Sequence, residues 1–138
     1  MLENIFFSHK DIIKVLQSES PVKGKRQLEP FKKLLADKKL PFSIIEDHEA
    51  TELESEVHKT EGDLWVCLEG EAEFVYGGEM IEPWTREGYK GNEIAGKGLR
   101  GGTTISFKPG DWLWIPPGQP HMHTAKNTVR MAIIKIRS

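Results

Sequence analysis

The 138-residue sequence contains only one cysteine, Cys67, so no disulfide can form within the chain. It also lacks an excess of basic residues, because 19 Lys and Arg stand against 21 Asp and Glu and the net charge is −2. A nucleic-acid-binding surface normally requires such an excess, and we expect no nucleic acid partner. A single thiol suits a reducing environment, which predicts a cytoplasmic protein.

Long apolar runs are also absent from the sequence. No uncharged stretch approaches the roughly 20 residues that a membrane-spanning helix needs, and we expect no membrane partner. The N-terminal MLENIFFSHKD has an acid at Glu3 and a short apolar run, unlike the basic start and long apolar core of a secretory signal. The length and the 38% hydrophobic composition are those of one ordinary globular domain.

Two short helical patterns, with a loop between them, occupy the start of the chain. Ser8 and Asp11 are the two ends of a capping box, and the apolar residues that follow them share one helical face. A second apolar stripe begins after Pro30, where a first helical turn tolerates proline. We therefore divide the chain into an N-terminal helical extension, residues 1–40, and a β domain, residues 41–138.

From Phe42 onward the apolar period changes from helical to strand-like. Turn residues such as Glu69-Gly70-Glu71 and Lys108-Pro109-Gly110 separate short runs that are rich in Val, Ile, Phe and Trp. Many short strands with hairpin spacing and no helices between them predict an all-β, antiparallel sandwich or barrel. The runs are FSIIED, DLWVCLEG, EAEFVYGG, TTISFKPG, DWLWIPPG and TVRMAIIKI.

The segment 77–102 differs from its neighbours, because eight of its 26 residues are glycine and it has no clear period. The sequence predicts a long loop or a ragged hairpin here. Loops of this length in compact domains are commonly functional lids or simply mobile, and both interpretations remain open.

The stretch GDWLWIPPGQPH carries the strongest signal in the sequence. Gly110, Pro116, Gly118 and His121 stand at the spacing G-x5-P-x-G-x2-H, which resembles the second motif of the cupin family. The family pattern ends in an asparagine four residues after the histidine, and this chain has Ala125 there.

The stretch around VHKTEGD is similar in spacing to the first cupin motif, G-x5-H-x-H-x4-E-x6-G. Its positions fall on Ala50, Glu56, His58, Asp63 and Gly70. His58 and Gly70 match the family residues outright. Glu56 replaces the first histidine, and Asp63 replaces the glutamate.

The resemblance, to a small single-domain cupin of the RmlC-like type, covers roughly residues 42–138. It implies a double-stranded β-helix, that is, a jelly-roll barrel with a metal ion inside. The implied ligands are His58 and His121 by direct match, with Glu56 and Asp63 as substituted positions. Two imidazoles and two carboxylates suit Fe, Mn, Ni, Co or Zn as the divalent ion and do not select among them.

The residues of the altered first motif also have interpretations that do not involve direct metal binding. Glu52, Glu54, Glu56 and His58 recur at period two, and a strand with its acidic face in water would turn Glu56 and His58 away from the core. Asp63 is one methylene shorter than glutamate, so it could reach a metal only through a water or support another ligand.

Three further residues are candidates for the site. His123 shares a strand face with His121, so it could be a further ligand, a catalytic acid or base, or a histidine hydrogen-bonded at the barrel mouth. Trp65 and Cys67 alternate in register with Asp63, which makes them candidate walls of a substrate pocket. Filling of the ordinary core is the alternative for both.

The leading functional expectation is a metal-dependent cupin enzyme that acts on a small organic molecule. The alternatives are a non-catalytic cupin that binds a small ligand, and a metal-free sugar isomerase or epimerase with His121 or His123 as its base. By analogy with other cupins we expect a homodimer, for which Trp112 and Trp114 are core or contact residues.

Overall fold

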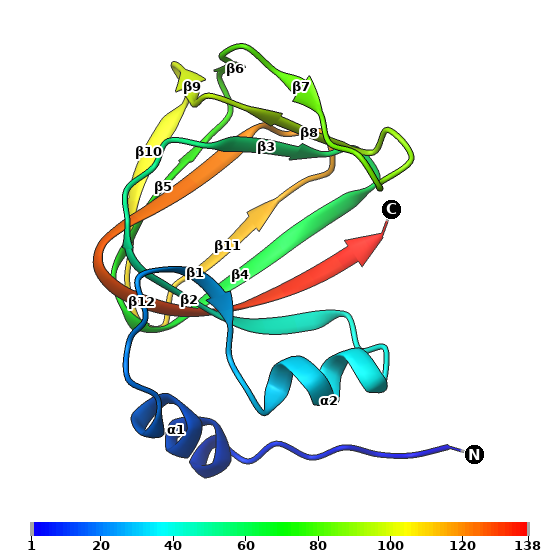
Figure 1. Cartoon of the computed structure of the whole chain (residues 1–138), viewed down its shortest axis with the longest axis vertical. Helices are drawn as coiled ribbons and strands as arrows, with labels where there is room; N and C mark the ends of the chain where they lie inside the picture. The colour runs from blue at the N-terminus through cyan, green and yellow to red at the C-terminus, as the bar shows by residue number, and fades with distance from the viewer. Residues whose placement is uncertain (1, 138) are drawn as a thin grey trace.

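The computed structural model describes residues 2–137, in which two short helices lie beside a β barrel (Figure 1). In chain order the elements are α1 (His9–Ser18), β1 (Gly24–Gln27), α2 (Phe31–Asp37), β2 (Phe42–Ala50), β3 (Ser55–His58), β4 (Glu61–Gly70), β5 (Ala72–Tyr76), β6 (Glu79–Met80), β7 (Trp84–Thr85), β8 (Glu93–Gly96), β9 (Leu99–Arg100), β10 (Thr103–Phe107), β11 (Trp112–Ile115) and β12 (His121–Arg137). Within residues 2–137 neither helix has the length and apolar character that crossing a membrane requires.

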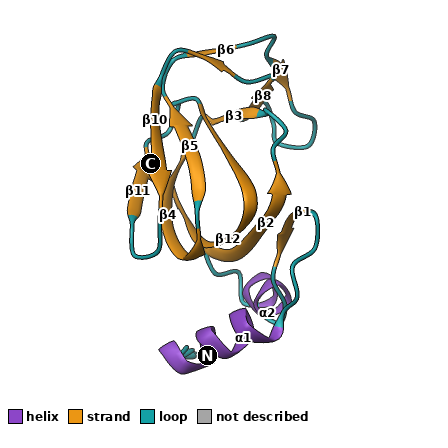
Figure 2. Cartoon of the chain, turned by 90° about the vertical axis from the view of Figure 1, so that its left-hand side faces the viewer, coloured by secondary structure: helices purple, strands orange, loops and turns teal. Residues whose placement is uncertain are grey.

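The long strand β12 joins two antiparallel sheets into the barrel (Figure 2). Its first residues pair with β3 and β5, and its longer second part pairs with β2 and β4. The register shifts between Ala125 and Thr128, where the strand passes from one sheet to the other. One sheet has the order β1-β2-β12-β4-β11, and the other has β7-β8-β3-β12-β5-β10. The predicted all-β jelly-roll barrel is confirmed.

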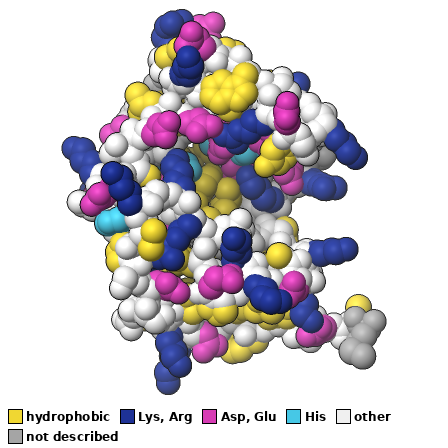
Figure 3. Space-filling view, in the orientation of Figure 1, with side chains coloured by type: hydrophobic (Ala, Val, Ile, Leu, Met, Phe, Trp, Pro, Cys, Tyr) yellow, Lys and Arg dark blue, Asp and Glu magenta, His cyan; other side chains and the backbone are white. Residues whose placement is uncertain are grey.

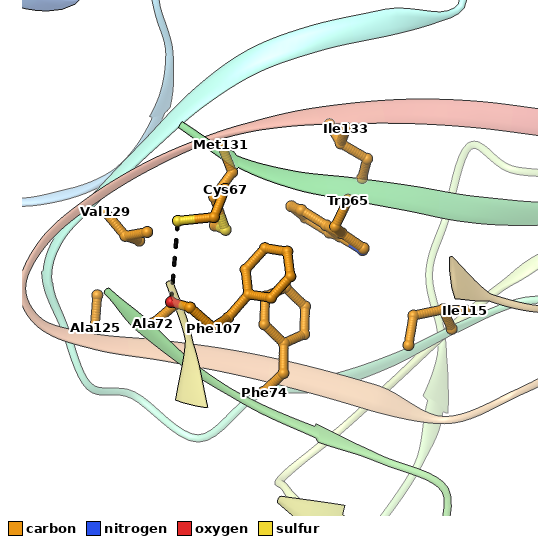
Figure 4. Close-up of a cluster of buried hydrophobic side chains, with 10 residues drawn as sticks. All are labelled: Trp65, Cys67, Ala72, Phe74, Phe107, Ile115, Ala125, Val129, Met131 and Ile133. Atoms are coloured by element: carbon orange, nitrogen blue, oxygen red, sulfur yellow. Dashed lines mark hydrogen bonds between the residues drawn. The ribbon is translucent and has the colours of Figure 1, made fainter. Parts of the chain in front are cut away.

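A cluster of apolar side chains fills part of the space between the two sheets (Figure 4). Aromatic rings pack edge to face within it, with centroids 5.2 Å apart for Trp65 and Phe74 and 5.1 Å apart for Phe74 and Phe107. Burial of each such ring contributes about 2 kcal/mol, so this cluster holds the two sheets together. Its buried members are Trp65, Cys67, Ala72, Phe74, Phe107, Ile115, Ala125, Val129, Met131 and Ile133.

The N-terminal elements pack on the outside of the barrel. The capping box predicted at Ser8 is present, since the Ser8 hydroxyl accepts from the Asp11 N–H and the Asp11 carboxylate accepts from the Ser8 N–H. A second apolar cluster joins both helices to β2. The segment between the helices was predicted as a loop, but it contains β1, which pairs with β2 at the edge of the sheet. The cluster's buried members are Leu16, Leu28, Phe31, Leu35 and Ile44.

The glycine-rich segment forms a ragged hairpin, which confirms one of the two structures predicted for it. β6 pairs with β9, and β7 pairs with β8. β8 also pairs with β3, which carries two of the candidate metal ligands. The segment therefore extends one sheet of the barrel and forms part of the surroundings of the site.

Candidate metal centre

Three strands bring the four candidate ligands together inside the barrel. Glu56 and His58 project from the same face of β3, Asp63 lies on β4, and His121 begins β12 directly opposite Glu56. One ligand atom from each residue lies within 4.8 Å of the others. His58 is only 7% exposed and Asp63 is fully buried, so the alternative of a strand face turned to water does not hold for His58.

The distances within this cluster suit a shared cation. The Nε2 atom of His58 lies 3.5 Å from Glu56 Oε1 and 3.2 Å from Asp63 Oδ2. The Nε2 atom of His121 lies 3.4 Å from the same Glu56 oxygen and 3.3 Å from the same Asp63 oxygen. Ligand bonds of roughly 2.0–2.2 Å to one divalent ion place neighbouring ligand atoms roughly 3.0–3.5 Å apart. Direct ionic hydrogen bonds would be closer, at about 2.8 Å.

Both histidines are oriented through their other ring nitrogen. The His121 Nδ1–H donates to the backbone oxygen of Gln119 at 2.9 Å. The His58 Nδ1–H donates to the Glu93 carboxylate at 2.5 Å, and Glu93 comes from β8 of the ragged hairpin. Such hydrogen bonds fix the ring orientation, so each Nε2 atom faces the cluster.

Within residues 2–137, two atoms of the cluster are buried without a hydrogen-bonding partner, namely Asp63 Oδ2 and His121 Nε2. They lie 3.3 Å apart, but their geometry is not that of a hydrogen bond. A buried polar atom left without a partner costs about 1–3 kcal/mol. A divalent cation between them would satisfy both atoms, so the donor set fits a metal ion.

Lys135, on β12, contacts the cluster and was not foreseen from the sequence. Its Nζ donates to Asp63 Oδ1 at 2.7 Å and lies 3.4 Å from His58 Nε2. Lys135 and Asp63 are partners in the β12–β4 register, and this pairing is the signal that would have placed Lys135 in the site. Glu93 was also not foreseen from the sequence, because only the pairing of β8 with β3 places it opposite His58.

No family model matches the sequence, and no curated protein matches it. In contrast, 84 chains of solved structures match the fold. A predicted oxalate decarboxylase from Thermotoga maritima aligns with a TM-score of 0.50 and 13% identity over 83% of this chain and 79% of its own. The chain has a cupin fold.

Other cupin domains align over less of their length. The Cnp3 cupin domain of Schizosaccharomyces pombe has a TM-score of 0.49 and 14% identity over 70% of this chain and 52% of its own. The CENP-C cupin domain of Drosophila melanogaster has a TM-score of 0.49 and 10% identity over 71% of this chain and 58% of its own. The present chain therefore spans about half the length of these chains.

The charges in the cupin barrel are strongly coupled. Burial alone would lower the pKa of His58, but the adjacent carboxylates of Asp63 and Glu56 outweigh it and raise the pKa to about 10. The same balance of burial against the same two carboxylates raises the pKa of His121 to about 9. Burial alone would raise the pKa of Asp63 and Glu56, but the two histidines hold both values well below their usual range.

A cavity of about 660 Å³ opens beside the cluster and is lined by Glu56 and Lys135 together with residues of both sheets. Figure 3 shows the hollow, with hydrophobic side chains in its depth and Lys and Arg side chains around its mouth. The volume lies in the range of small-molecule sites. A ligand in this cavity would lie next to the candidate metal centre.

His123 and Trp65 also line this cavity. His123 lies outside the four-residue cluster, and its Nδ1–H donates to Asp47 Oδ2 at 2.7 Å. The ring of Trp65 packs edge-on against His123, with centroids 4.9 Å apart. Cys67 lies deeper, in the apolar cluster, with its thiol near the Phe107 carbonyl (Figure 4), and burial raises its pKa to about 11.

Proposed function

We propose that this cupin is a metal-dependent enzyme that acts on a small organic substrate held in the barrel. The observation that carries the proposal is the pair of buried, unpartnered atoms Asp63 Oδ2 and His121 Nε2. The ligand atoms of His58 and Glu56 lie within 4.8 Å of them. One divalent ion held by the four residues would account for this arrangement.

Two nitrogen and two oxygen ligands suit Fe, Mn, Co, Ni or Zn. A bound ion would act as a Lewis acid that polarises a substrate oxygen. Glu56 belongs to both the cluster and the cavity wall, which would set the substrate directly beside the ion.

His123 is our candidate for the catalytic acid or base. Asp47 accepts the hydrogen bond from Nδ1–H, which leaves the Nε2 atom for proton exchange with a substrate in the cavity that His123 lines. Trp65 would form one wall of the substrate pocket, and Cys67 would support that wall from the core.

The position of Lys135 favours a second candidate function, in which a metal-free cupin binds a small ligand or isomerises a sugar. Its ammonium group lies 2.7 Å from Asp63 Oδ1, so it already neutralises part of the negative charge that would attract a cation. In this case the protonated histidines and Lys135 would bind an anionic ligand directly.

Elemental analysis of protein purified without added metal or chelator separates the two functions. We expect about one divalent ion per chain, and the His121→Ala variant is expected to lose it while keeping its circular dichroism spectrum. The matched control is His9→Ala, since His9 is exposed on α1, far along the chain from the cluster. Metal-free wild-type protein that still binds small ligands would support the second candidate.

We also propose that the protein is a homodimer. β11 pairs only with β4 within residues 2–137, and it carries Trp112 and Trp114 with 67% and 46% of their surfaces exposed. A second copy could cover these rings. Light scattering should give twice the chain mass for the wild type and the chain mass for Trp112→Asp; a monomeric wild type would refute the proposal.

A further inference from the structure

A second polar cluster lies in the wall of the same cavity, outside the candidate metal centre. Asp47 on β2 is fully buried, and its Oδ2 accepts the hydrogen bond from His123 Nδ1–H at 2.7 Å. Its other oxygen, Oδ1, is buried without a hydrogen-bonding partner in the part of the chain that the structure describes. Asp47 therefore has one acceptor site available for a ligand.

Lys25, on β1, is the cation nearest to this carboxylate. Its Nζ lies 4.0 Å from Asp47 Oδ2 and donates to the backbone oxygen of His123 at 3.2 Å. Neither contact involves Asp47 Oδ1. The Lys25 side chain is 44% exposed, so its ammonium group can also reach a ligand at the cavity mouth.

The cavity wall also holds an unused donor. The indole Nε1–H of Trp65 is buried without a partner among the described residues, and Trp65 as a whole is 2% exposed. Each buried polar atom without a partner costs about 1–3 kcal/mol, and folded chains keep few of them. Asp47 and Trp65 both line the cavity, so an unpaired acceptor and an unpaired donor in its wall indicate a ligand that both donates and accepts hydrogen bonds.

The charges of the cavity favour an anion. Five basic and three acidic side chains line it. Arg26 and Arg86 are already paired with carboxylates, and so is Lys135. Across residues 2–137, Lys25 has no carboxylate closer than 4.0 Å, which leaves it available for an acidic group of the ligand.

We propose that the cavity binds a small hydroxylated organic anion of the sugar-acid class. Lys25 holds its carboxylate, Asp47 Oδ1 accepts a hydrogen bond from one hydroxyl, and Trp65 Nε1–H donates to another. A hydroxyl suits Asp47 better than an ammonium group does, because the Lys25 ammonium group already lies 4.0 Å from this carboxylate and His123 donates to it. A six-carbon sugar acid is small enough for a cavity of about 660 Å³.

This inference rests on the proposed function, since the ligand would occupy the cavity beside Glu56. The test is calorimetric titration of the protein as purified with gluconate, hexanoate and sorbitol. Hexanoate has the charge without the hydroxyls, and sorbitol has the hydroxyls without the charge. We expect gluconate to bind at least about tenfold more tightly than either, because a hydrogen bond to a charged group contributes that much.

Two variants then test which residues cause the preference for gluconate over hexanoate. Asp47→Asn should remove most of the preference for gluconate over hexanoate without weakening hexanoate binding, whereas the exposed Asp37→Asn control should behave as wild type. Trp65→Phe keeps an aromatic ring and removes only the N–H, so it tests the inference even if Asp47→Asn fails to fold. It should weaken gluconate binding about threefold to tenfold without affecting hexanoate.

The outcomes separate this inference from the proposed function. Equal affinity for gluconate and hexanoate, or no binding of gluconate, would overturn the inference, while the metal content would still decide the proposed function. A gluconate preference that disappears in Asp47→Asn, in protein that contains no metal, would support the inference and refute the metal-dependent enzyme.

Discussion

Two buried charged clusters in this chain differ in how completely their groups are hydrogen-bonded. In the first, Arg130 is 2% exposed and donates to the carboxylates of Glu46 and Glu69 and to the backbone oxygens of Leu16 and Glu19. These contacts attach the C-terminal end of α1 and the loop after it to β12. The first cluster therefore fixes the N-terminal segment on the barrel.

The Glu46 carboxylate completes this first cluster from β2. Its Oε1 accepts from Arg130, and its Oε2 accepts from Arg26 at 2.7 Å and from the Val22 N–H at 3.1 Å. Burial alone would raise the pKa of Glu46, but the hydrogen bonds from Arg26 and Arg130 lower it below its usual value. Both carboxylate oxygens thus have partners within the chain.

The second cluster, formed by the four candidate metal ligands, is also largely buried but incomplete. Asp63 Oδ2 and His121 Nε2 have no partners in the described part of the chain. A buried ionic group whose partners all lie in the chain stabilises the architecture, whereas one with open positions is available to a ligand. The comparison predicts that substitutions in the first cluster change stability and substitutions in the second change binding.

The largest expected effect is that of Arg130→Ala. It leaves the buried Oε1 atom of Glu46 without its Arg130 partner and should lower the free energy of unfolding by about 3–5 kcal/mol. Urea denaturation measures this change, and Arg137→Ala, at an exposed side chain, should change it by less than about 0.5 kcal/mol. Folded Arg130→Ala protein should still contain metal; selective loss of metal without loss of stability would contradict the comparison.

The pH dependence of metal binding should show the next largest effect. The pKa is about 10 for His58 and about 9 for His121, so both rings are protonated near neutral pH. Metal binding must therefore displace two protons. Apparent affinity should therefore rise with pH by up to about 100-fold per pH unit below roughly pH 9. Titration with a competing chelator at several pH values measures this slope.

The metal-free protein should show the opposite trend in stability. Because folding raises the pKa of both histidines above the unfolded value of roughly 6.5, their contribution is complete below that pH and is lost as pH rises towards 9 and 10. The first cluster relies on arginine, which stays charged throughout this range. Stability of the metal-free protein that is independent of pH from roughly 6.5 to 9 would contradict these shifts.

The sequence could predict which candidate ligands meet, because their spacing matches the cupin motifs even where the residue type differs. The intervals between Glu56, His58 and Asp63 set two strands and a short turn, and the Pro-Gly bend before His121 returns the chain to the barrel. The structure brings these four residues together, although two of them differ from the family pattern. The fold prediction succeeded for the same reason, since turn residues and strand periods are local features.

The partners of the ligands could not be predicted, because they depend on contacts between distant strands. Lys135 faces Asp63 across 72 positions of sequence, and Glu93 faces His58 across 35. Asp47 lies 76 positions from His123. β1 was missed because its sequence GKRQ is polar and becomes a strand only by pairing with β2.

Glu93→Gln tests how strongly a partner that is distant in the sequence affects the metal affinity of the cluster. The amide keeps the size of the side chain but weakens the hydrogen bond that orients His58 Nε2 towards the other ligands. Loss of such a supporting partner typically costs 10- to 100-fold in metal affinity, and we expect about tenfold. Chelator competition measures it, with Glu82→Gln, an exposed position on the same hairpin, as the control. Unchanged affinity would show that packing alone orients His58.

The smallest expected effect, and the one that separates the two functions, is that of Lys135→Met. Methionine keeps an apolar stem and removes the ammonium group that lies 2.7 Å from Asp63 Oδ1. If the cluster binds a metal, loss of this competing charge should strengthen metal affinity about fivefold, by roughly 1 kcal/mol. Lys97→Met, at an exposed ion pair, should leave it unchanged. If Lys135 instead holds an anionic ligand in a metal-free barrel, the same substitution should weaken binding of that ligand, so the sign of the change decides between the two functions.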